Sequence, residues 1–339
     1  MIFDSGDMMK HFGIKQQDTH ILTDSFGRVH DYLRISLTDR CNLRCTYCMP
    51  SERMTFAHTS KLMTADEIYA MAEVFVNLGV KKIRLTGGEP LVRPDARQII
   101  QSLSALDTEL TITTNATKTD GFIQEFKQAG IKSINVSLDT FNKEKFFTIT
   151  RRHDFDKVWS NIMDLINYDF HVKLNVVAME GVNDDELIDF VRFTKDHPVH
   201  IRFIEFMPFP GNQWKMESVF TYVEMLNRVQ ATFDCKKLID EKHSTAKKYK
   251  VPGHLGTFAF INTVTMPFCG DCNRMRLTAD GKIKNCLFSK EEMDLLTPLR
   301  AGKDIVPLIT DALMQKKAVT GGQDFSRPTK NRSMIAIGG

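Results

Sequence analysis

The stretch DRCNLRCTYC, residues 39–48, places cysteines at positions 41, 45 and 48, directly after the strand-like run YLRISLT (32–38). Thiolates bind iron, zinc or copper. A structural zinc site usually has four protein ligands in two separated pairs, but no Cys or His follows this trio within nine residues. A compact trio suits three corners of an iron–sulfur cubane. The fourth iron would then be open to a small molecule.

Outward from this junction, short β-rich runs alternate with segments of helical period, which predicts parallel strands joined by right-handed crossovers. Thr64 followed by Glu67 indicates a helix start, and Gly79 and Gly130 indicate helix ends. Six such units make an α/β fold, either an open doubly wound sheet or a partial barrel, with ligands at the carboxyl ends of the strands. The expected strands are 32–38, 81–86, 109–114, 131–138, 172–179 and 199–206, and the expected helices are 64–78, 95–105, 119–129, 154–168 and 184–196.

The alternation stops after residue 210, which divides the chain into four parts. We expect a loose leader at 1–20, the repeating region at 21–210, a second region at 211–320 and an irregular tail at 321–339 that ends in Gly-Gly. The second region is expected to contain a helix near 216–231, a basic loop at 241–250, strands at 257–264, 274–278 and 282–286, and helices at 290–300 and 303–317.

Composition and charge limit the classes of function. The chain of 339 residues is 42% hydrophobic and 26% charged, with a formal net charge of +3. This small charge argues against a dedicated nucleic-acid binder. Neither a secretory signal nor an apolar run of membrane-spanning length is present in the sequence. Seven cysteines in a chain predicted to be cytoplasmic indicate metal or redox chemistry rather than disulfides.

A second trio, Cys269, Cys272 and Cys286, has the spacing C-x₂-C-x₁₃-C. A Cys₃His zinc site completed by His243 or His254 is one reading, and Cys235 as fourth ligand is another; we prefer Cys235 as a small buried apolar residue. Two arginines follow the pair of cysteines, at positions two apart that share one side of a strand. Their guanidinium groups suit an anionic or purine ligand, unless they lie on an exposed edge strand.

Two motifs carry a resemblance to a known superfamily. C-x₃-C-x₂-C with Tyr47 before its last cysteine, together with GGEP (87–90) after the second strand, resembles the radical S-adenosylmethionine (SAM) superfamily. The second trio followed by RMR (274–276) resembles one family within it, the GTP 3′,8-cyclase (MoaA) family of molybdenum cofactor biosynthesis. The similarity runs from about residue 23 to 339, and includes DSFGR (24–28), INVSLD (134–139) and IRFIEFMP (201–208).

This resemblance implies both a fold and an activity. The fold would be an incomplete (β/α)₆ TIM-like barrel whose open side is closed by a C-terminal α+β region. Two [4Fe–4S] clusters would be present, the first binding SAM and the second binding the guanine of GTP. A 5′-deoxyadenosyl radical would remove hydrogen from C3′ of GTP, and the ribose radical would attack C8 of guanine to give 3′,8-cyclo-7,8-dihydro-GTP. The expected partners are an electron donor and the downstream enzyme cyclic pyranopterin monophosphate synthase. Neither a nucleic acid nor a membrane is an expected partner, and the protein is expected to be a monomer or a homodimer.

The resemblance also assigns residues by their place in the motifs. Cys41, Cys45 and Cys48 would hold the first cluster, and Cys269, Cys272 and Cys286 the second. SAM would be contacted by Tyr47, Gly88, Ser137 and Met207. GTP would be bound by Arg34, Arg84, Thr113, Lys173, Arg274, Met275 and Arg276, with Arg274 and Arg276 also serving catalysis. The terminal Gly-Gly is implied to reach into the active site.

Some positions and alternatives stay open at this level. Lys82 and Arg202 are further candidates because they also lie within expected strands, and Glu205 is either an acid near the site or a salt-bridge partner. Ala116 stands in TTNA (113–116) where the family commonly has glycine, and alanine disfavours a positive φ. The competing functions are another twin-cluster radical SAM enzyme, such as a peptide-modifying maturase, and a non-catalytic zinc-binding protein.

Overall fold

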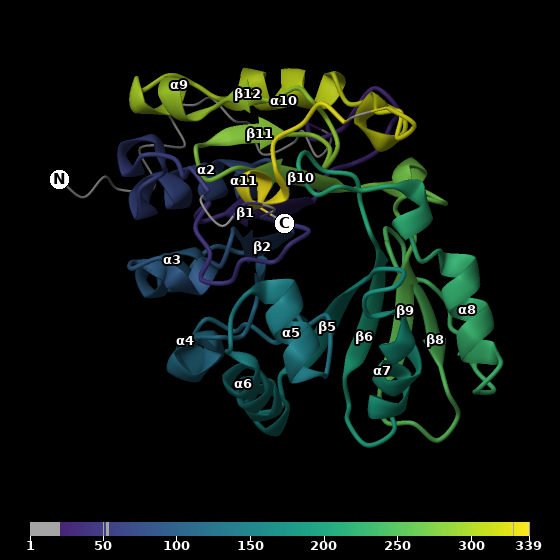
Figure 1. Cartoon of the computed structure of the whole chain (residues 1–339). Helices are drawn as coiled ribbons and strands as arrows, with labels where there is room; N and C mark the ends of the chain where they lie inside the picture. The colour runs from purple at the N-terminus through teal and green to yellow at the C-terminus, as the bar shows by residue number, and fades with distance from the viewer. Residues whose placement is uncertain (1–20, 50, 52–53, 328, 339) are drawn as a thin grey trace.

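The computed structural model describes residues 21–49, 51, 54–327 and 329–338, so the expected leader lies outside the described residues. The described strands form one twelve-stranded sheet (Figure 1). In chain order they are β1 (Tyr32–Ser36), β2 (Lys82–Thr86), β3 (Glu109–Thr114), β4 (Ser133–Ser137), β5 (His171–Ala178), β6 (His200–Glu205), β7 (Lys236–Lys237), β8 (Lys247–Lys250), β9 (Thr257–Ile261), β10 (Arg274–Leu277), β11 (Lys282–Lys284) and β12 (Met293–Asp294).

The strand order is β12-β11-β10-β1-β2-β3-β4-β5-β6-β9-β8-β7. Strands β1 to β6 are parallel neighbours in chain order, which confirms the predicted βα repeat. The C-terminal region extends this series at both ends, since β9 pairs in parallel with β6 and β10 in parallel with β1. The strands beyond β9 and β10 are antiparallel.

Helices lie between the strands and close to the expected positions. They are α2 (Ala65–Asn77), α3 (Ala96–Leu103), α4 (Ile123–Gln128), α5 (Lys143–Thr150), α6 (Phe155–Asn167), α7 (Leu187–Phe193), α8 (Tyr222–Gln230), α9 (Leu296–Arg300), α10 (Val306–Met314) and α11 (Met334–Ile337). Helix α2 begins with the capping box that Thr64 and Glu67 predict, and Gly79 follows it with φ 107°. Within the described residues, none of these helices has the length and apolarity to cross a membrane.

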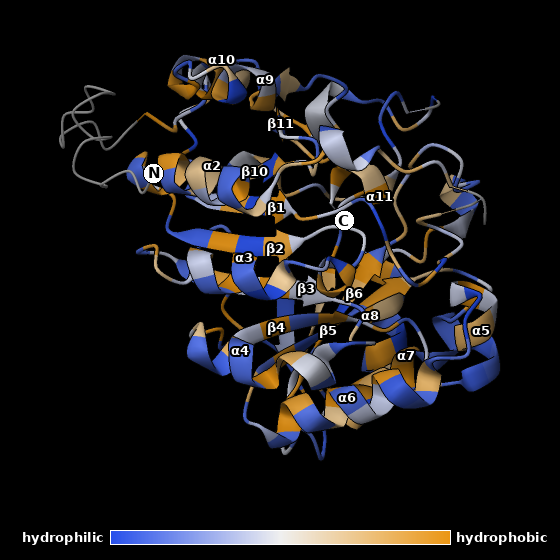
Figure 2. Cartoon of the chain, turned by 90° about the vertical axis from the view of Figure 1, so that its left-hand side faces the viewer, coloured by the Kyte–Doolittle hydropathy of each residue, from blue (hydrophilic) through white to orange (hydrophobic). Residues whose placement is uncertain are grey.

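The two faces of the parallel strands differ in polarity. On one face Leu33, Ile35, Ile83 and Leu85 are fully buried in the hydrophobic core that the helices cover. Each fully buried side chain of this kind contributes about 1.5–3 kcal/mol to folding. Figure 2 shows hydrophilic and hydrophobic residues mixed along β2. Because side chains alternate along a strand, the polar residues share the opposite face, where the chemistry is expected.

Four expectations about local structure are wrong. Helix α5 was missed because KEKFFTIT is rich in aromatic and β-branched residues, although the Asn142 side chain caps it. The segment expected to be helical over 290–300 contains β12 before α9, and part of the basic loop is strand β8. The tail at 321–339, expected to be irregular, contains α11.

Candidate active site

One cavity of ≈ 780 Å³ lies on the polar face of the sheet. Its lining includes all six cysteines of the two trios, which come from the loop after β1 and from the C-terminal region. Cys235 is not among its lining residues and packs against the hydrophobic core, although it is only partly buried. The fold therefore brings two cysteine clusters more than 200 positions apart in sequence to a single site.

The loop that carries the first trio is fixed from two sides. Its backbone bonds to the end of α5, with Arg44 N donating to Thr150 O at 2.9 Å and Thr46 N to Ile149 O at 2.9 Å. A Cβ on Gly88 would collide with the carbonyl oxygen of Arg40. Glycine is thus required where the GGEP turn touches the cysteine loop, so its first role is packing between two loops rather than only approach to a ligand.

The first trio lies in a buried, partly acidic environment. Burial raises the pKa of Cys41 to about 11 and of Cys48 to about 12, and raises that of Cys45 well above its usual value. The neighbouring carboxylates of Glu89 and Asp139 act in the same direction. Such thiols bind metal by losing their protons, so bound metal would offset the negative thiolate charge that this site otherwise disfavours.

The residues fit an iron–sulfur cluster in two further respects. The three thiols face one cavity from one loop, as a cubane with three protein ligands requires. The Asn115 amide donates to Cys41 Sγ at 3.7 Å, a kind of contact that tunes cluster sulfurs. Asn115 comes directly after β3, at the carboxyl end of a parallel strand, where ligands are expected.

Residues expected to contact SAM gather around this trio. Tyr47, Gly88, Ser137 and Met207 all line the cavity. The Tyr47 hydroxyl donates to Asp139 Oδ2 at 2.8 Å, and Val177 N donates to Asp139 Oδ1 at 2.8 Å. Burial nevertheless raises the pKa of Asp139 to about 6. Glu89 of GGEP accepts bonds from Thr114 and Asn115, and its burial raises its pKa to about 7.

The second trio has cationic neighbours instead. Thr320 N donates to Cys269 Sγ at 3.3 Å, while Cys272 Sγ lies 3.5 Å from Lys316 Nζ and 3.8 Å from Arg274 Nη2. Burial works to raise the pKa of Cys272, but the two cations outweigh it and lower this pKa to about 7. Three thiols that line one cavity, two of them with N–H donors, fit a second cluster by the same criteria as the first.

Of the two histidines considered for a zinc site, only His243 lines the cavity and contacts the loop of the second trio. His243 Nδ1 lies 2.8 Å from Asp271 Oδ1, and His254 Nδ1 lies 2.8 Å from Thr194 Oγ1. In the part of the chain that the structure describes, no group of three or more His, Cys, Asp or Glu residues has the arrangement of a site for one metal ion.

A wall of cationic side chains lines the same cavity as the two trios. The register places Arg276, Arg34 and Arg84 side by side on β10, β1 and β2, while Lys173 and Arg202 lie across the cavity on β5 and β6. Lys82 and Thr113 also line the cavity.

Burial and the neighbouring cations lower the pKa of several of these groups. The pKa falls to about 8 for Lys173, about 9 for Arg202 and about 10 for Arg276, and Arg34 is lowered well below its usual value. Burying like charges together is costly unless an anion compensates them.

Several polar atoms of this wall are buried without a hydrogen-bond partner in the structure. They belong to Arg84 (Nη1), Arg202 (Nε and Nη2), Thr113 (Oγ1), Asn135 (Oδ1) and Asn175 (Oδ1). Buried polar groups are normally hydrogen-bonded, so these atoms fit a polar, multiply charged ligand. Asn135 and Asn175 were missed in the sequence, although both lie on the polar face of their strands and line the cavity.

Met275 differs from its two arginine neighbours. Its side chain is fully buried in the hydrophobic core, whereas Arg274 and Arg276 line the cavity. This follows from strand alternation, which sends the middle residue of RMR to the other face. Its side chain therefore does not reach the cavity, in contrast to the lining role that the resemblance implies.

The last described residues of the C-terminal tail contact two residues that line the cavity. Gly338 O accepts from Arg276 Nη1 at 2.8 Å and from Thr86 Oγ1 at 3.4 Å. A Cβ on Gly338 would lie 2.7 Å from the Ser36 Cβ. Helix α11 leads to this point beside β1 and β10, as Figures 1 and 2 show. Gly339 lies outside the described residues.

Two further positions differ from expectation or gain a role. Ala116 adopts φ 60°, so the expectation that alanine avoids this conformation is wrong; the turn is held by the Asn161 amide, which donates to Ala116 O at 2.6 Å. Glu205 is fully buried and accepts bonds from Tyr222 N, Val264 N and Thr265 N. It therefore joins β6 to the C-terminal region, and it forms no salt bridge with a cation among the described residues.

Comparison with known proteins identifies the superfamily and the fold of this chain. Residues 35–194 match the Radical SAM superfamily, and residues 199–321 match Molybdenum Cofactor Synthesis C. The solved structure of SuiB from Streptococcus suis bound to S-adenosylmethionine is similar in fold, with a TM-score of 0.61 and 16% identity over 93% of this chain and 70% of that one. The protein thus has a radical SAM α/β fold with a parallel sheet.

Relatives identify the family within that class. The chain is 45% identical to the mitochondrial GTP 3′,8-cyclase of Arabidopsis thaliana over 94% of this chain and 84% of the relative. It is 41% identical to the GTP 3′,8-cyclase of Peptoclostridium acidaminophilum over 94% and 98%. The chain belongs to the GTP 3′,8-cyclase family of radical SAM enzymes. It spans about half the length of some relatives: the mouse molybdenum cofactor biosynthesis protein 1 is 46% identical over 94% of this chain and 51% of its own length.

Proposed function

We propose that this protein is a GTP 3′,8-cyclase that forms 3′,8-cyclo-7,8-dihydro-GTP for molybdenum cofactor biosynthesis. The observation that carries the proposal is the single cavity that the two cysteine trios and the cationic wall line together. Its family membership names the reaction, and the cavity holds groups suited to both partners of that reaction.

The first trio would hold a [4Fe–4S] cluster that, when bound with SAM, supplies the radical that starts the reaction. Around it, Tyr47 is oriented by Asp139, and Gly88 lets the GGEP turn lie against the cysteine loop. Ser137 and Met207 complete the proposed SAM contacts from the ends of β4 and β6. Buried carboxylates beside this trio favour a ligand that carries positive charge, as the sulfonium and amino groups of SAM do.

The cationic wall would bind GTP. Arg34, Arg84 and Lys173, with Thr113, would hold the triphosphate and ribose, and we add Lys82 and Arg202 to this set because both line the same cavity. Arg274 and Arg276 would contact the nucleotide from β10, and Met275 would do so only through its backbone. We propose that the Gly338 carbonyl orients the Arg276 guanidinium for this task.

The overall organisation follows the same proposal. The six-strand series would be the incomplete TIM-like barrel of residues 21–210, and the region at 211–320 would close its open side. Strands β9 and β10 at the two ends of the series support this assignment. An electron donor, a downstream cyclic pyranopterin monophosphate synthase, a monomeric or homodimeric state and a cytoplasmic location complete the proposal.

Reconstitution tests the proposed reaction directly. The protein would be purified without oxygen, loaded with iron and sulfide, and incubated with SAM, a reductant and GTP. We expect SAM cleavage and a cyclised GTP product. Iron-replete protein that cleaves SAM and leaves GTP unchanged would favour a different twin-cluster radical SAM enzyme. Colourless protein containing zinc would eliminate both.

Arg202 offers a binding test with an internal control. Arg202→Met removes a buried guanidinium, and loss of a charged hydrogen bond weakens GTP binding by about 1.5–3 kcal/mol, roughly ten- to a hundredfold. The metal-free variant should be at least as stable to urea as the unchanged protein, because a buried cation crowded by other cations is costly. Arg192→Met, an exposed position on α7, should alter neither GTP binding nor stability measurably. Unchanged GTP affinity in Arg202→Met would remove Arg202 from the site.

A further inference from the structure

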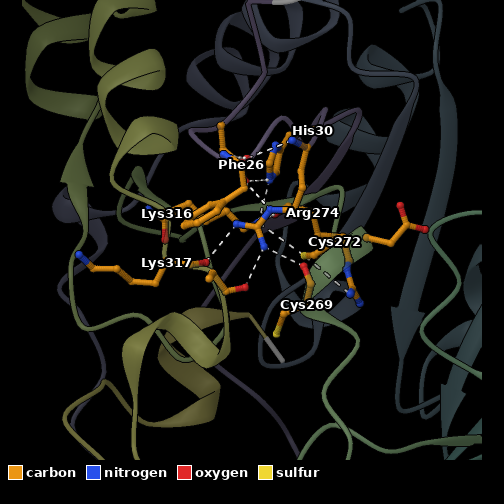
Figure 3. Close-up of polar contacts among 12 residues, drawn as sticks. Phe26, His30, Cys269, Cys272, Arg274, Lys316 and Lys317 are labelled. Atoms are coloured by element: carbon orange, nitrogen blue, oxygen red, sulfur yellow. Dashed lines mark hydrogen bonds and ion pairs between the residues drawn. The ribbon is translucent and has the colours of Figure 1, made fainter.

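Lys316 is a buried lysine that the proposed reaction leaves without a role. It follows α10, its exposed fraction is 4%, and it is not among the residues that line the cavity. It lies behind the second trio, where Figure 3 shows His30, Cys272, Arg274 and Lys316 grouped together. Buried lysines are rare unless they are paired, so its contacts indicate its purpose.

The contacts of the Lys316 ammonium group account for all three of its protons. Its Nζ lies 2.8 Å from His30 Nε2, 3.1 Å from Arg274 O and 3.5 Å from Cys272 Sγ. An ammonium group has three donors and no acceptor. Each proton therefore has one acceptor, and one of the three is directed at a cysteine sulfur.

The hydrogen bonds of His30 fix the tautomer that can accept a hydrogen bond from Lys316. His30 Nδ1 lies 3.3 Å from Leu22 O, and a carbonyl oxygen only accepts hydrogen bonds. The Nδ1 atom must then carry the proton, which leaves Nε2 free to accept from Lys316. His30 is fully buried, so its ring is fixed in place by packing as well as by these bonds.

Two other charged side chains near the Lys316 ammonium group, those of Arg28 and Asp24, are paired with each other. Arg28 Nε pairs with Asp24 Oδ2 at 2.6 Å, and its Nη1 donates to Cys269 O at 2.7 Å and Ala318 O at 3.0 Å. Asp24 Oδ2 lies 3.6 Å from His30 Nε2 and is shared with Arg28. The carboxylate nearest to this group is thus paired with Arg28, and the Lys316 charge is directed toward the sulfur.

We propose that Lys316 is a positioning residue of the second cluster, directed at Cys272 by His30 and the Arg274 carbonyl, and that it makes this cluster easier to reduce. This inference rests on the proposed function, in which the second trio holds a cluster. Cluster potentials depend on hydrogen bonds to the sulfurs, on net charge and on burial. Reduction adds negative charge, which a buried ammonium beside the sulfur stabilises. At the first trio, the donor to Cys41 is instead the neutral amide of Asn115.

A redox titration of the reconstituted full-length chain tests the inference. The reduced fraction of the second cluster would be followed by electron paramagnetic resonance, with dithionite as the reductant. A parallel chain with the first three cysteines changed to serine isolates the signal. In Lys316→Met, we expect at least a tenfold lower ratio of reduced to oxidised cluster at a fixed potential, a shift of about 59 mV for a one-electron couple.

The neighbouring lysine is the matched control. Lys317 is exposed, and Lys317→Met removes the same charge one residue away, so the potential should stay unchanged. If Lys316→Met takes up too little iron to titrate, Lys316→Gln, which keeps a donor but loses the charge, replaces it with the same expected direction. An unchanged potential in the titratable variant overturns the inference. A chain without the first trio that binds no iron overturns the second cluster itself.

Discussion

Cys45 and Cys272 face the same cavity, yet the structure gives their thiols opposite electrical surroundings. Burial raises the pKa of Cys45 well above its ordinary value, and Asp139 adds to that effect. At Cys272 burial acts in the same direction, but Arg274 and Lys316 overcome it and lower the pKa to about 7. The same ligand atom therefore sits in an acidic environment in the first trio and in a basic one in the second.

This difference indicates that the cysteine ligands alone do not determine which small molecule binds at each trio. Asp139 follows β4 and Lys316 follows α10, so two of the charges that distinguish the sites come from segments remote from the trios, whereas Arg274 stands two residues after Cys272. An acidic environment favours a cationic ligand and a basic one an anionic ligand. This supports SAM at the first trio and GTP at the second, and four experiments test the comparison from its largest expected effect to its smallest.

The largest effect is expected from Cys45→Ser. Loss of one thiolate leaves the first cluster with two protein ligands, so SAM cleavage should fall below detection and bound iron should drop by about half. Both are measured on anaerobically reconstituted protein, by 5′-deoxyadenosine formation and by iron analysis. Cys235→Ser, which changes the cysteine outside the cavity, should retain both. Normal SAM cleavage in Cys45→Ser would mean that the first trio does not hold the SAM cluster.

Cys272→Ser should separate the two trios. It removes a ligand of the second cluster only, so GTP cyclisation should fall by about a hundredfold or more, a loss of about 3 kcal/mol in transition-state stabilisation. SAM cleavage should remain within severalfold of the unchanged protein. The rates of the two products are compared in one reaction. Loss of iron from both sites in this single variant would undermine the assignment of two independent clusters.

The raised pKa of Asp139, beside the first trio, should make the free energy of unfolding depend on pH. Burial raises its pKa from 3.8 to about 6, so the folded state binds this proton more tightly than the unfolded state. The contribution of Asp139 to stability is therefore greatest below pH 4, is lost as the pH rises toward 6, and stays constant above that. Asp139→Asn should gain about 2 kcal/mol relative to the unchanged metal-free protein between pH 4 and 7.5.

Urea unfolding at several pH values measures this difference. Asp189→Asn, an exposed acid on α7, should show a nearly constant difference from the unchanged protein over the same range. A constant difference for Asp139→Asn as well would show that burial does not destabilise its carboxylate, and the acidic half of the comparison would fail.

The sequence predicted the parts of the molecule that depend on local pattern. The βα repeat follows from alternating periods, and the placement of Arg274 and Arg276 on one side follows from strand geometry. The same rule, applied to Met275, places its side chain in the core, where the structure has it. For this residue, strand alternation predicts the side-chain position better than the resemblance does.

The remaining features depend on contacts that no local pattern encodes. Lys316 meets His30 and Cys272 only after the chain has folded, since 286 positions separate Lys316 from His30. The left-handed Ala116 is stabilised by Asn161 from α6, a contact that overrides the preference of alanine. Helix α5 forms against its propensity because it anchors the cysteine loop by backbone bonds. Tertiary contacts decide each of these cases.

The smallest expected effect is a difference in thiol reactivity in the metal-free chain. With a pKa of about 7, Cys272 is mostly thiolate at pH 7.5, whereas Cys48, with a pKa of about 12, is almost entirely protonated. Iodoacetamide should therefore label Cys272 at least about tenfold faster than Cys48, because the lower intrinsic nucleophilicity of an acidic thiol offsets only part of the roughly 10⁴-fold gain in thiolate. Mass spectrometry of peptides gives both rates in one sample, and lowering the pH to 6 should slow Cys272 several-fold. Equal rates would mean that Arg274 and Lys316 do not stabilise the thiolate, and the basic half of the comparison would have no chemical consequence.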